Sequence, residues 1–218
     1  MSGVVAVVAQ RVWDALVDRG FEPALRRGAA EVGRYQEWTG VPVPAEVAEL
    51  WSVLGGRDLL GMCLEGADSA GRYVAARADE AESSDPGEPF EELDGSAEDA
   101  VRKVWWDRGW CALYATADLA IAVDSHPGAK GRVGQVVYCD MDMYADREAV
   151  WESVEEFLRD LLAVVSSEGL TVEDGFGSLA GTDGYRYLVS MAVLELGRAR
   201  RDGRPVSLVA FAEGNDRH

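Results

Sequence analysis

The residues with the clearest chemical potential lie in the segment 124–146. Glycines at positions 128, 131 and 134 surround Lys130 in a polar turn, and such glycines let backbone N–H groups approach a phosphate closely. The spacing matches neither a P-loop, which needs a Lys-Ser or Lys-Thr pair entering a helix, nor the Gly-x-Gly-x-x-Gly of dinucleotide-binding proteins. Because the residues that follow alternate like a strand, the glycines predict a tight hairpin turn rather than a phosphate site.

Carboxylates in the same segment suggest a cation site. Asp140, Asp142 and Asp146 resemble the opening of a calcium loop, and Asp124 precedes them. An EF-hand also needs a glycine at its sixth position and a glutamate at its twelfth, where this chain has alanine and tryptophan. The four acids could still gather a divalent cation, but the pattern favours a helix cap at Asp146 and surface acids elsewhere.

Catalysis by histidine would depend on a single residue. His126 and His218 are the only histidines, which excludes a multi-histidine metal site. Ser125 beside His126 is no evidence for a catalytic triad, because triad partners meet across a fold rather than in sequence. An enzyme or metal-dependent protein is therefore the least favoured hypothesis. It would use Asp124, Asp140, Asp142 and His126.

The charge of the chain indicates what it can bind. Its 218 residues include 39 acidic and 21 basic ones, for a net charge of -18, and 48% are hydrophobic. This is enough apolar material for one packed core. The negative field repels nucleic-acid phosphate and anionic membrane surfaces, and it attracts a basic protein. Nucleic acid and membrane are therefore not expected partners, whereas a basic protein is, although solubility alone also explains the charge.

Cysteines and the first residues indicate the compartment. Cys63, Cys111 and Cys139 are odd in number and far apart, as expected for small core residues in a reducing environment. The opening MSGVVAVVAQ has no basic lead-in, and its apolar run ends at Gln10 and Arg11, so we expect neither a signal peptide nor a membrane span. These features favour the cytoplasm.

The spacing of apolar residues predicts the elements that carry these side chains. Helical spacing predicts helices over 5–17, 29–38, 44–54, 146–165 and 185–200. Alternation predicts strands over 119–123 and 133–139 within a sheet core from Trp110 to Asp140, with further strands at 59–64 and 205–211. In the helix that Asp146 would cap, Glu152, Glu155, Glu156, Arg159 and Asp160 are expected to face water. Residues 1–165 then form one α+β domain, and 166–218 form a linker with a C-terminal helix and strand.

An acidic run, DEAESSDPGEPFEELDGSAED, occupies residues 79–99. Its many carboxylates, two prolines and few apolar residues predict an exposed loop. One interpretation is a solvated insertion. The other is a negatively charged arm that contacts a basic partner, with Phe90 and Leu93 as apolar anchors.

Four phrases, taken in order, resemble the SUKH superfamily, which includes fungal cell-wall-assembly regulators and bacterial immunity proteins of polymorphic toxin systems. TGVPVPAEVAELWSVLGG is similar to the family's Gly, Leu-Pro, acidic helix and closing Asn-Gly, here replaced by Gly55-Gly56. Residues 110–124 resemble its Trp-led strand pair ending in Asp. GAKGRVGQVVYCD resembles its Gly and Gly-Gln-Val turn and strand, and ADREAVWESVEEFL its closing Ser-x-x-x-Phe-Leu helix. The resemblance covers about residues 5–165.

The resemblance implies an α+β fold, with a central mostly antiparallel or mixed sheet and helices packed on it, and function by protein binding without a cofactor. The first hypothesis is an immunity protein that occludes the active site of a toxin domain with an acidic surface. The second is a regulatory or scaffolding protein that binds a cellular or biosynthetic enzyme. The candidate contacts are Asp79, Glu80, Glu82, Glu91, Glu92, Asp94, Asp124, Asp140 and Asp142.

Overall fold

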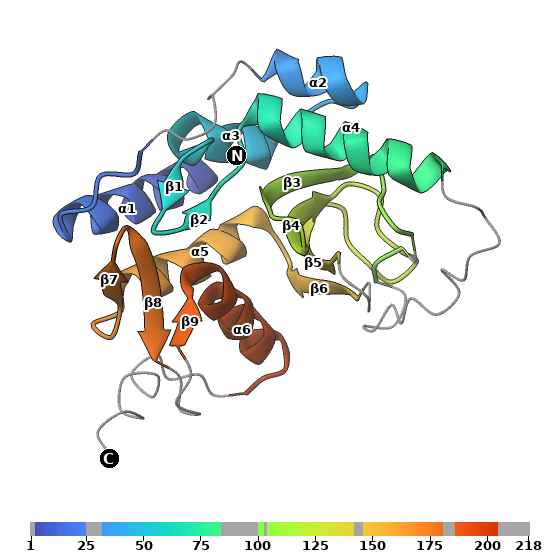
Figure 1. Cartoon of the computed structure of the whole chain (residues 1–218). Helices are drawn as coiled ribbons and strands as arrows, with labels where there is room; N and C mark the ends of the chain where they lie inside the picture. The colour runs from blue at the N-terminus through green and yellow to red at the C-terminus, as the bar shows by residue number, and fades with distance from the viewer. Residues whose placement is uncertain are drawn as a thin grey trace.

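An antiparallel sheet forms the centre of the fold, in a computed structural model that describes residues 3–24, 32–83, 100–102, 104–141, 146–180 and 186–204. Within these ranges the sheet has four strands in sequence order (Figure 1). They are β3 (Trp110–Ala115), β4 (Leu119–Asp124), β5 (Gln135–Asp140) and β6 (Arg147–Trp151). The prediction of an α+β fold with helices packed on a central sheet is confirmed, and of the two predicted sheet types, mostly antiparallel or mixed, the sheet is antiparallel.

The strands β3, β4 and β5 are buried almost throughout, so both of their faces belong to the core. The helix α4 (Ala67–Ser83) packs against β3, and α5 (Val154–Ser166) packs against β5 and β6. Next to α4, Trp106 makes edge-to-face contacts with Tyr73 and Trp110, with ring centroids 5.2 and 5.4 Å apart. Cys111 and Cys139 are buried inside this core without a disulfide, as predicted, and Cys63 is half-buried.

The three N-terminal helices pack against α5 and α4. α1 (Val4–Asp18) and α3 (Ala45–Leu54) pack on each other and on α5, whereas α2 (Gly33–Thr39) lies along α4 (Figure 1). The helices predicted over 5–17 and 44–54 are confirmed, because their periodic apolar residues are the ones that become buried. The helix predicted over 29–38 begins only at Gly33, and residues 25–31 lie outside the described ranges.

The helix predicted over 146–165 begins at Val154, and its N-cap lies seven residues beyond Asp146. Arg147–Trp151 forms β6 instead, and Ser153 is the N-cap of α5, with its Oγ accepting a hydrogen bond from the Glu156 backbone N–H at 3.3 Å. Glu156 in turn accepts from the backbone N–H of Glu152 at 3.0 Å. The prediction of a cap at Asp146 was wrong because the Ser-x-x-Glu signal at 153–156 is the stronger one.

Two further corrections concern residues 59–83. The strand predicted over 59–64 is a tight hairpin of β1 (Asp58–Leu59) and β2 (Met62–Cys63), turned by Leu60 and Gly61 at φ values of 58° and 92°. The acidic run was predicted to be a loop from residue 79, but α4 continues to Ser83. Helical alanines and buried Val74 and Ala78 extend the helix into the acidic run.

The described part of the C-terminal region is docked on the main body. The segment predicted as a linker contains β7 (Thr171–Glu173) and β8 (Phe176–Ala180), which form a second sheet with β9 (Arg186–Leu188). α6 (Val189–Arg201) follows directly and packs on α5 and β6. The strand predicted at 205–211 lies outside the described residues. Within the described ranges, no helix combines the length and the apolar character needed to cross a membrane.

Candidate binding surface

Asp79, Glu80 and Glu82 project from the last turns of α4, and we call these three residues the acidic end of α4. Their side chains are 74%, 55% and 67% exposed. In the sequence, residues 84–99 follow directly and contain seven acidic residues and no basic ones. Glu91, Glu92 and Asp94, three of the predicted contacts, belong to that segment and lie outside the described residues.

Two arginines lie beside the acidic end of α4. The Arg108 guanidinium bonds to Glu82 at 2.9 Å and approaches Asp79 at 3.3 Å, and Arg77 pairs with Glu80 at 2.8 Å. The hydrogen bond to Glu82 contributes most to raising the pKa of Arg108. Such exposed ion pairs contribute about 0–1 kcal/mol each. The carboxylates therefore remain accessible to cations of a partner.

Asp124, by contrast, was wrongly predicted as a contact residue. It is fully buried at the end of β4, where its carboxylate accepts hydrogen bonds from the His126 backbone N–H at 2.8 Å and from Gln135 Nε2 at 2.9 Å. Burial raises the pKa of Asp124 above its ordinary value. This carboxylate closes the β4–β5 connection and has no surface to offer a partner.

A cation site, the less favoured interpretation of the four aspartates, is not formed by Asp124 and Asp140. Asp124 pairs with Gln135 and Asp140 pairs with Leu119, so the two aspartates lie at opposite ends of the β4–β5 ladder, about 17 Å apart at 3.4 Å per residue. Asp140 is half-buried and stays a predicted contact, whereas Asp142 lies outside the described residues. Among the residues that the structure describes, no three His, Cys, Asp or Glu side chains are placed to hold a metal ion.

The glycine turn between β4 and β5 uses its own N–H groups. The backbone N–H of Gly128 donates to the Ala100 carbonyl at 2.9 Å, and that of Gly131 donates to the Gly128 carbonyl at 3.0 Å. The N–H of Gly134 donates to the Asp124 carbonyl at 2.8 Å. Gly131 also lies so close to Ala100 that a Cβ there would come within 2.0 Å of the Ala100 carbonyl oxygen. The segment joins the antiparallel strands β4 and β5 as a hairpin, as predicted, but residues 125–134 make it longer than a tight turn. Its N–H groups are not directed at a phosphate.

The turn also contains an interaction that the sequence did not reveal. His126 Nδ1 lies 2.9 Å from a carboxylate oxygen of Asp107, and the Gly109 backbone N–H donates to the same oxygen at 2.7 Å. Arg102 pairs with the other oxygen of Asp107. A carboxylate that orients an imidazole recurs in catalytic triads. Here Asp107 also bonds to a backbone N–H and an arginine, which makes it the centre of a structural network.

A buried carboxylate, Asp160, and a partly buried one, Glu148, attach α6 to the main body. Asp160 was predicted to face water but is 1% exposed, and it accepts a hydrogen bond from Trp151 Nε1 at 2.8 Å. Arg200 of α6 forms an ion pair with it. Glu148 of β6 likewise forms ion pairs with Arg198 and Arg201 of α6, with a nitrogen–oxygen distance of 2.7 Å in each. The prediction for Asp160 failed because its partner Arg200 lies 40 residues further along the chain.

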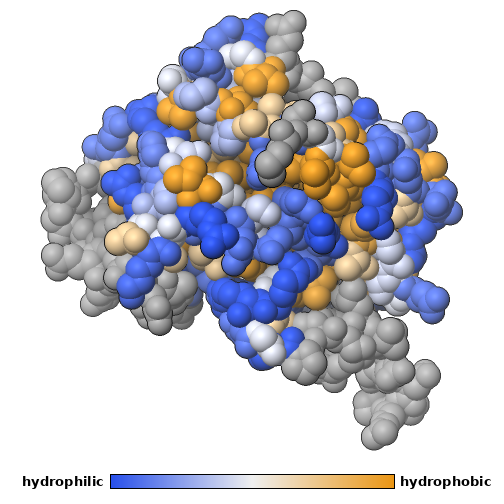
Figure 2. Space-filling view, turned by 180° about the vertical axis from the view of Figure 1, so that it is seen from behind, coloured by the Kyte–Doolittle hydropathy of each residue, from blue (hydrophilic) through white to orange (hydrophobic). Residues whose placement is uncertain are grey.

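Exposed apolar side chains are distributed over several elements. Val4 and Val7 are exposed at the start of α1, Val172, Phe176 and Leu188 in the sheet β7–β9, and Trp38 on α2. On the face seen from behind, hydrophilic residues surround separate hydrophobic patches (Figure 2). Single exposed apolar residues are normal for a protein surface, so exposure alone identifies no site.

Comparison with known sequences adds no relative. The chain matches no protein-family model and no curated protein. The SUKH resemblance therefore stays a prediction, carried by the four sequence phrases.

The predicted contact residues thus fall into distinct groups. Asp79, Glu80 and Glu82 share one exposed helix end, Asp140 lies at a distant sheet end, and Asp124 is internal. The acidic end of α4 is the described surface that agrees with the predicted mode of binding.

Proposed function

We propose that this protein is a non-catalytic, cytoplasmic binding domain that engages a basic protein, and that this partner is a toxin domain whose active site it occludes. The observation that carries the proposal is the acidic end of α4, where three exposed carboxylates precede a segment with seven more acidic residues. The order of the four SUKH-like phrases supports the choice of an immunity protein. The partner contacts carboxylates on a rigid helix whose other face is buried against the sheet.

Electrostatics gives this surface a physical role. With a net charge of -18, the protein attracts a basic domain at long range and accelerates their encounter. Screening limits this attraction to roughly 8 Å at physiological salt, so contact depends on the carboxylates nearest to the partner. Association is therefore expected to slow steeply as salt is raised.

Co-expression with the protein encoded by the neighbouring gene tests the proposal. We expect a stable complex and protection of the cell from that protein's toxicity. Failure to form the complex would count against the proposal. A complex that forms without any toxicity to neutralise would instead favour the regulatory or scaffolding hypothesis.

A charge-reversal experiment tests which surface is used. Replacing Asp79, Glu80 and Glu82 with lysine is expected to weaken the complex far more than replacing Asp14, Asp18 and Glu22 with lysine. Both triple variants change the net charge equally, and the second set lies on the exposed side of α1 and the residues after it. Equal losses would show that only the overall charge matters and that the acidic end of α4 is not a contact.

A further inference from the structure

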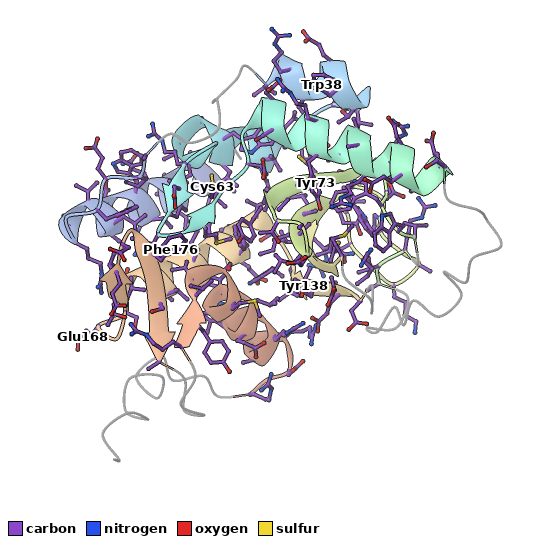
Figure 3. The ribbon with its side chains drawn as sticks, in the orientation of Figure 1. Trp38, Cys63, Tyr73, Tyr138, Glu168 and Phe176 are labelled. Carbon is purple, nitrogen blue, oxygen red and sulfur yellow. The ribbon has the colours of Figure 1, made fainter. Side chains whose placement is uncertain are left out.

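Trp38 is an exposed aromatic residue that its surroundings hold in place. Its side chain is on α2, beside the first half of α4, and the residue is 47% exposed (Figure 3). The indole Nε1 donates a hydrogen bond to Asp68 of α4 at 3.1 Å. The guanidinium carbon of Arg72 lies 5.4 Å from the ring centroid, within the range of a cation–π contact.

Close packing beneath the ring fixes it further. A Cβ at Gly71 would lie 3.1 Å from both Cβ and Cδ1 of Trp38, so the glycine lets α2 approach α4. Arg72 and Asp68 also pair with each other at 2.7 Å. The ring, the cation and the carboxylate thus restrict one another before any partner arrives. A side chain that is already ordered loses little conformational entropy on binding, and tryptophan and arginine are the residues most enriched at binding hot spots.

The exposed side of α4 connects Trp38 to the acidic end of the helix. Asp68, Arg72, Ala75 and Asp79 follow one another at intervals of three and four residues, so they share one face. At 1.5 Å per residue, Asp79 lies about 17 Å along the helix from Asp68. Between the aromatic and the acidic ends lie Arg72, which is already paired with Asp68, and the short side chain of Ala75.

We propose that Trp38 and this face of α4, from Asp68 to Glu82, form one docking surface for a basic segment of the partner protein. An apolar side chain of that segment packs on Trp38, and a lysine or arginine about 17 Å away pairs with Asp79 and Glu82. The charge complementarity of the acidic end selects a basic occupant. This inference rests on the proposed function and adds to it the aromatic anchor.

Phe176 on β8 provides a matched control. It is 56% exposed, more than Trp38, but it belongs to the sheet β7–β9 and packs over Gly61 instead of α4 (Figure 3). If exposed aromatic area alone determined binding, the two residues would be equivalent. If the α2–α4 surface is used, only Trp38 matters.

Titration calorimetry with the protein encoded by the neighbouring gene tests the inference. We expect Trp38→Ala to weaken binding at least about 30-fold, the loss typical of a hot spot. Phe176→Ala is expected to change it less than about threefold. In hydrogen exchange of the wild-type complex, α2 and α4 should gain protection, which tests the surface even if a variant folds poorly. A loss of less than threefold for Trp38→Ala, or protection confined to other elements, would overturn the inference and leave the proposed function intact.

If that protein forms no complex, the proposed function fails and the surface is tested separately. A displayed library of random 20-residue peptides is then selected on the wild-type protein, and one enriched peptide is synthesised. We expect this peptide to combine basic and apolar residues and to lose binding to the Trp38→Ala variant. Equal binding to both proteins would overturn the docking surface.

Discussion

Carboxylates meet arginines at two places in this molecule, with opposite consequences. At the acidic end of α4, Asp79 and Glu82 share the half-exposed Arg108, and both remain mostly in water. On α5, Asp160 is almost completely buried between Trp151 and Arg200. The first group can exchange its arginine for a partner's cation at little cost, whereas the second would leave a buried charge unpaired. Identical residue types thus dock α6 at one site and, in the proposed function, meet a basic partner at the other.

The difference arises from what covers each helix. Asp160 belongs to a run of charged residues on α5 that the sequence predicts to face water, but α6 packs over part of that face. Nothing among the described residues covers the acidic end of α4 in the same way, because α2 lies along the first part of that helix. Burial of a charge therefore depends on tertiary packing that the local pattern does not contain.

Removing the buried carboxylate should produce the largest effect. Asp160→Ala leaves the indole N–H of Trp151 and the Arg200 guanidinium without their acceptor, and we expect a loss of about 3 kcal/mol in the free energy of unfolding. Asp160→Asn keeps an acceptor for the indole and should lose less. Chemical denaturation measures both. If Asp160→Ala costs no more than Asp79→Ala, the distinction between the two sites is wrong.

The packing of α6 on β6 provides the next test. A Cβ at Gly197 would lie 2.5 Å from Trp151 Nε1 and 2.7 Å from Val150 Cγ1, so Gly197→Ala must displace the ring that Asp160 holds. We expect a loss of about 2 kcal/mol in the free energy of unfolding, from overpacking. Gly33→Ala is the control, because a Cβ there meets nothing within 4 Å. A Gly197→Ala variant as stable as wild type would show that α6 is loosely docked.

The pH dependence of stability should reveal the buried Asp124. Burial raises the pKa of Asp124 above the ordinary value of 3.8, so the folded state favours the protonated carboxyl group. As pH rises through the raised pKa, this group ionises and the folded state becomes less stable relative to the unfolded state. The free energy of unfolding of Asp124→Asn, relative to wild type, should therefore increase between pH 3.5 and 7. Asp202→Asn should show the opposite slope, because Arg201 lowers the pKa of Asp202. A pH-independent difference for Asp124→Asn would contradict this account.

The sequence predicted the elements whose signals are local. Helical spacing located α1 and α3, because one buried face dictates the pattern of each helix. Alternation located β4, although both of its faces are buried, because the larger residues Leu119, Ile121 and Val123 alternate with alanines. The helix α4 was missed because its alanines and charges give a weak apolar stripe. Of the predicted contacts, Asp79, Glu80 and Glu82 proved exposed, since a dense acidic run is rarely buried. Pairs such as Asp107 with His126, or Asp160 with Arg200, join distant segments and have no sequence signal.

Arg108→Gln is expected to change stability least, but to change the rate of association with a basic partner. Arg108→Gln removes the cation beside Asp79 and Glu82, and exposed pairs of this kind contribute less than about 1 kcal/mol, so folding should be almost unaffected. The carboxylates would then meet a basic partner without competition, and association at low salt should accelerate. Arg159→Gln removes an equal charge beside Glu155 on α5 and serves as the control. Stopped-flow association rates compare the two variants. An equal acceleration would mean that net charge acts alone, whereas a larger effect of Arg108→Gln would place the partner at the acidic end of α4.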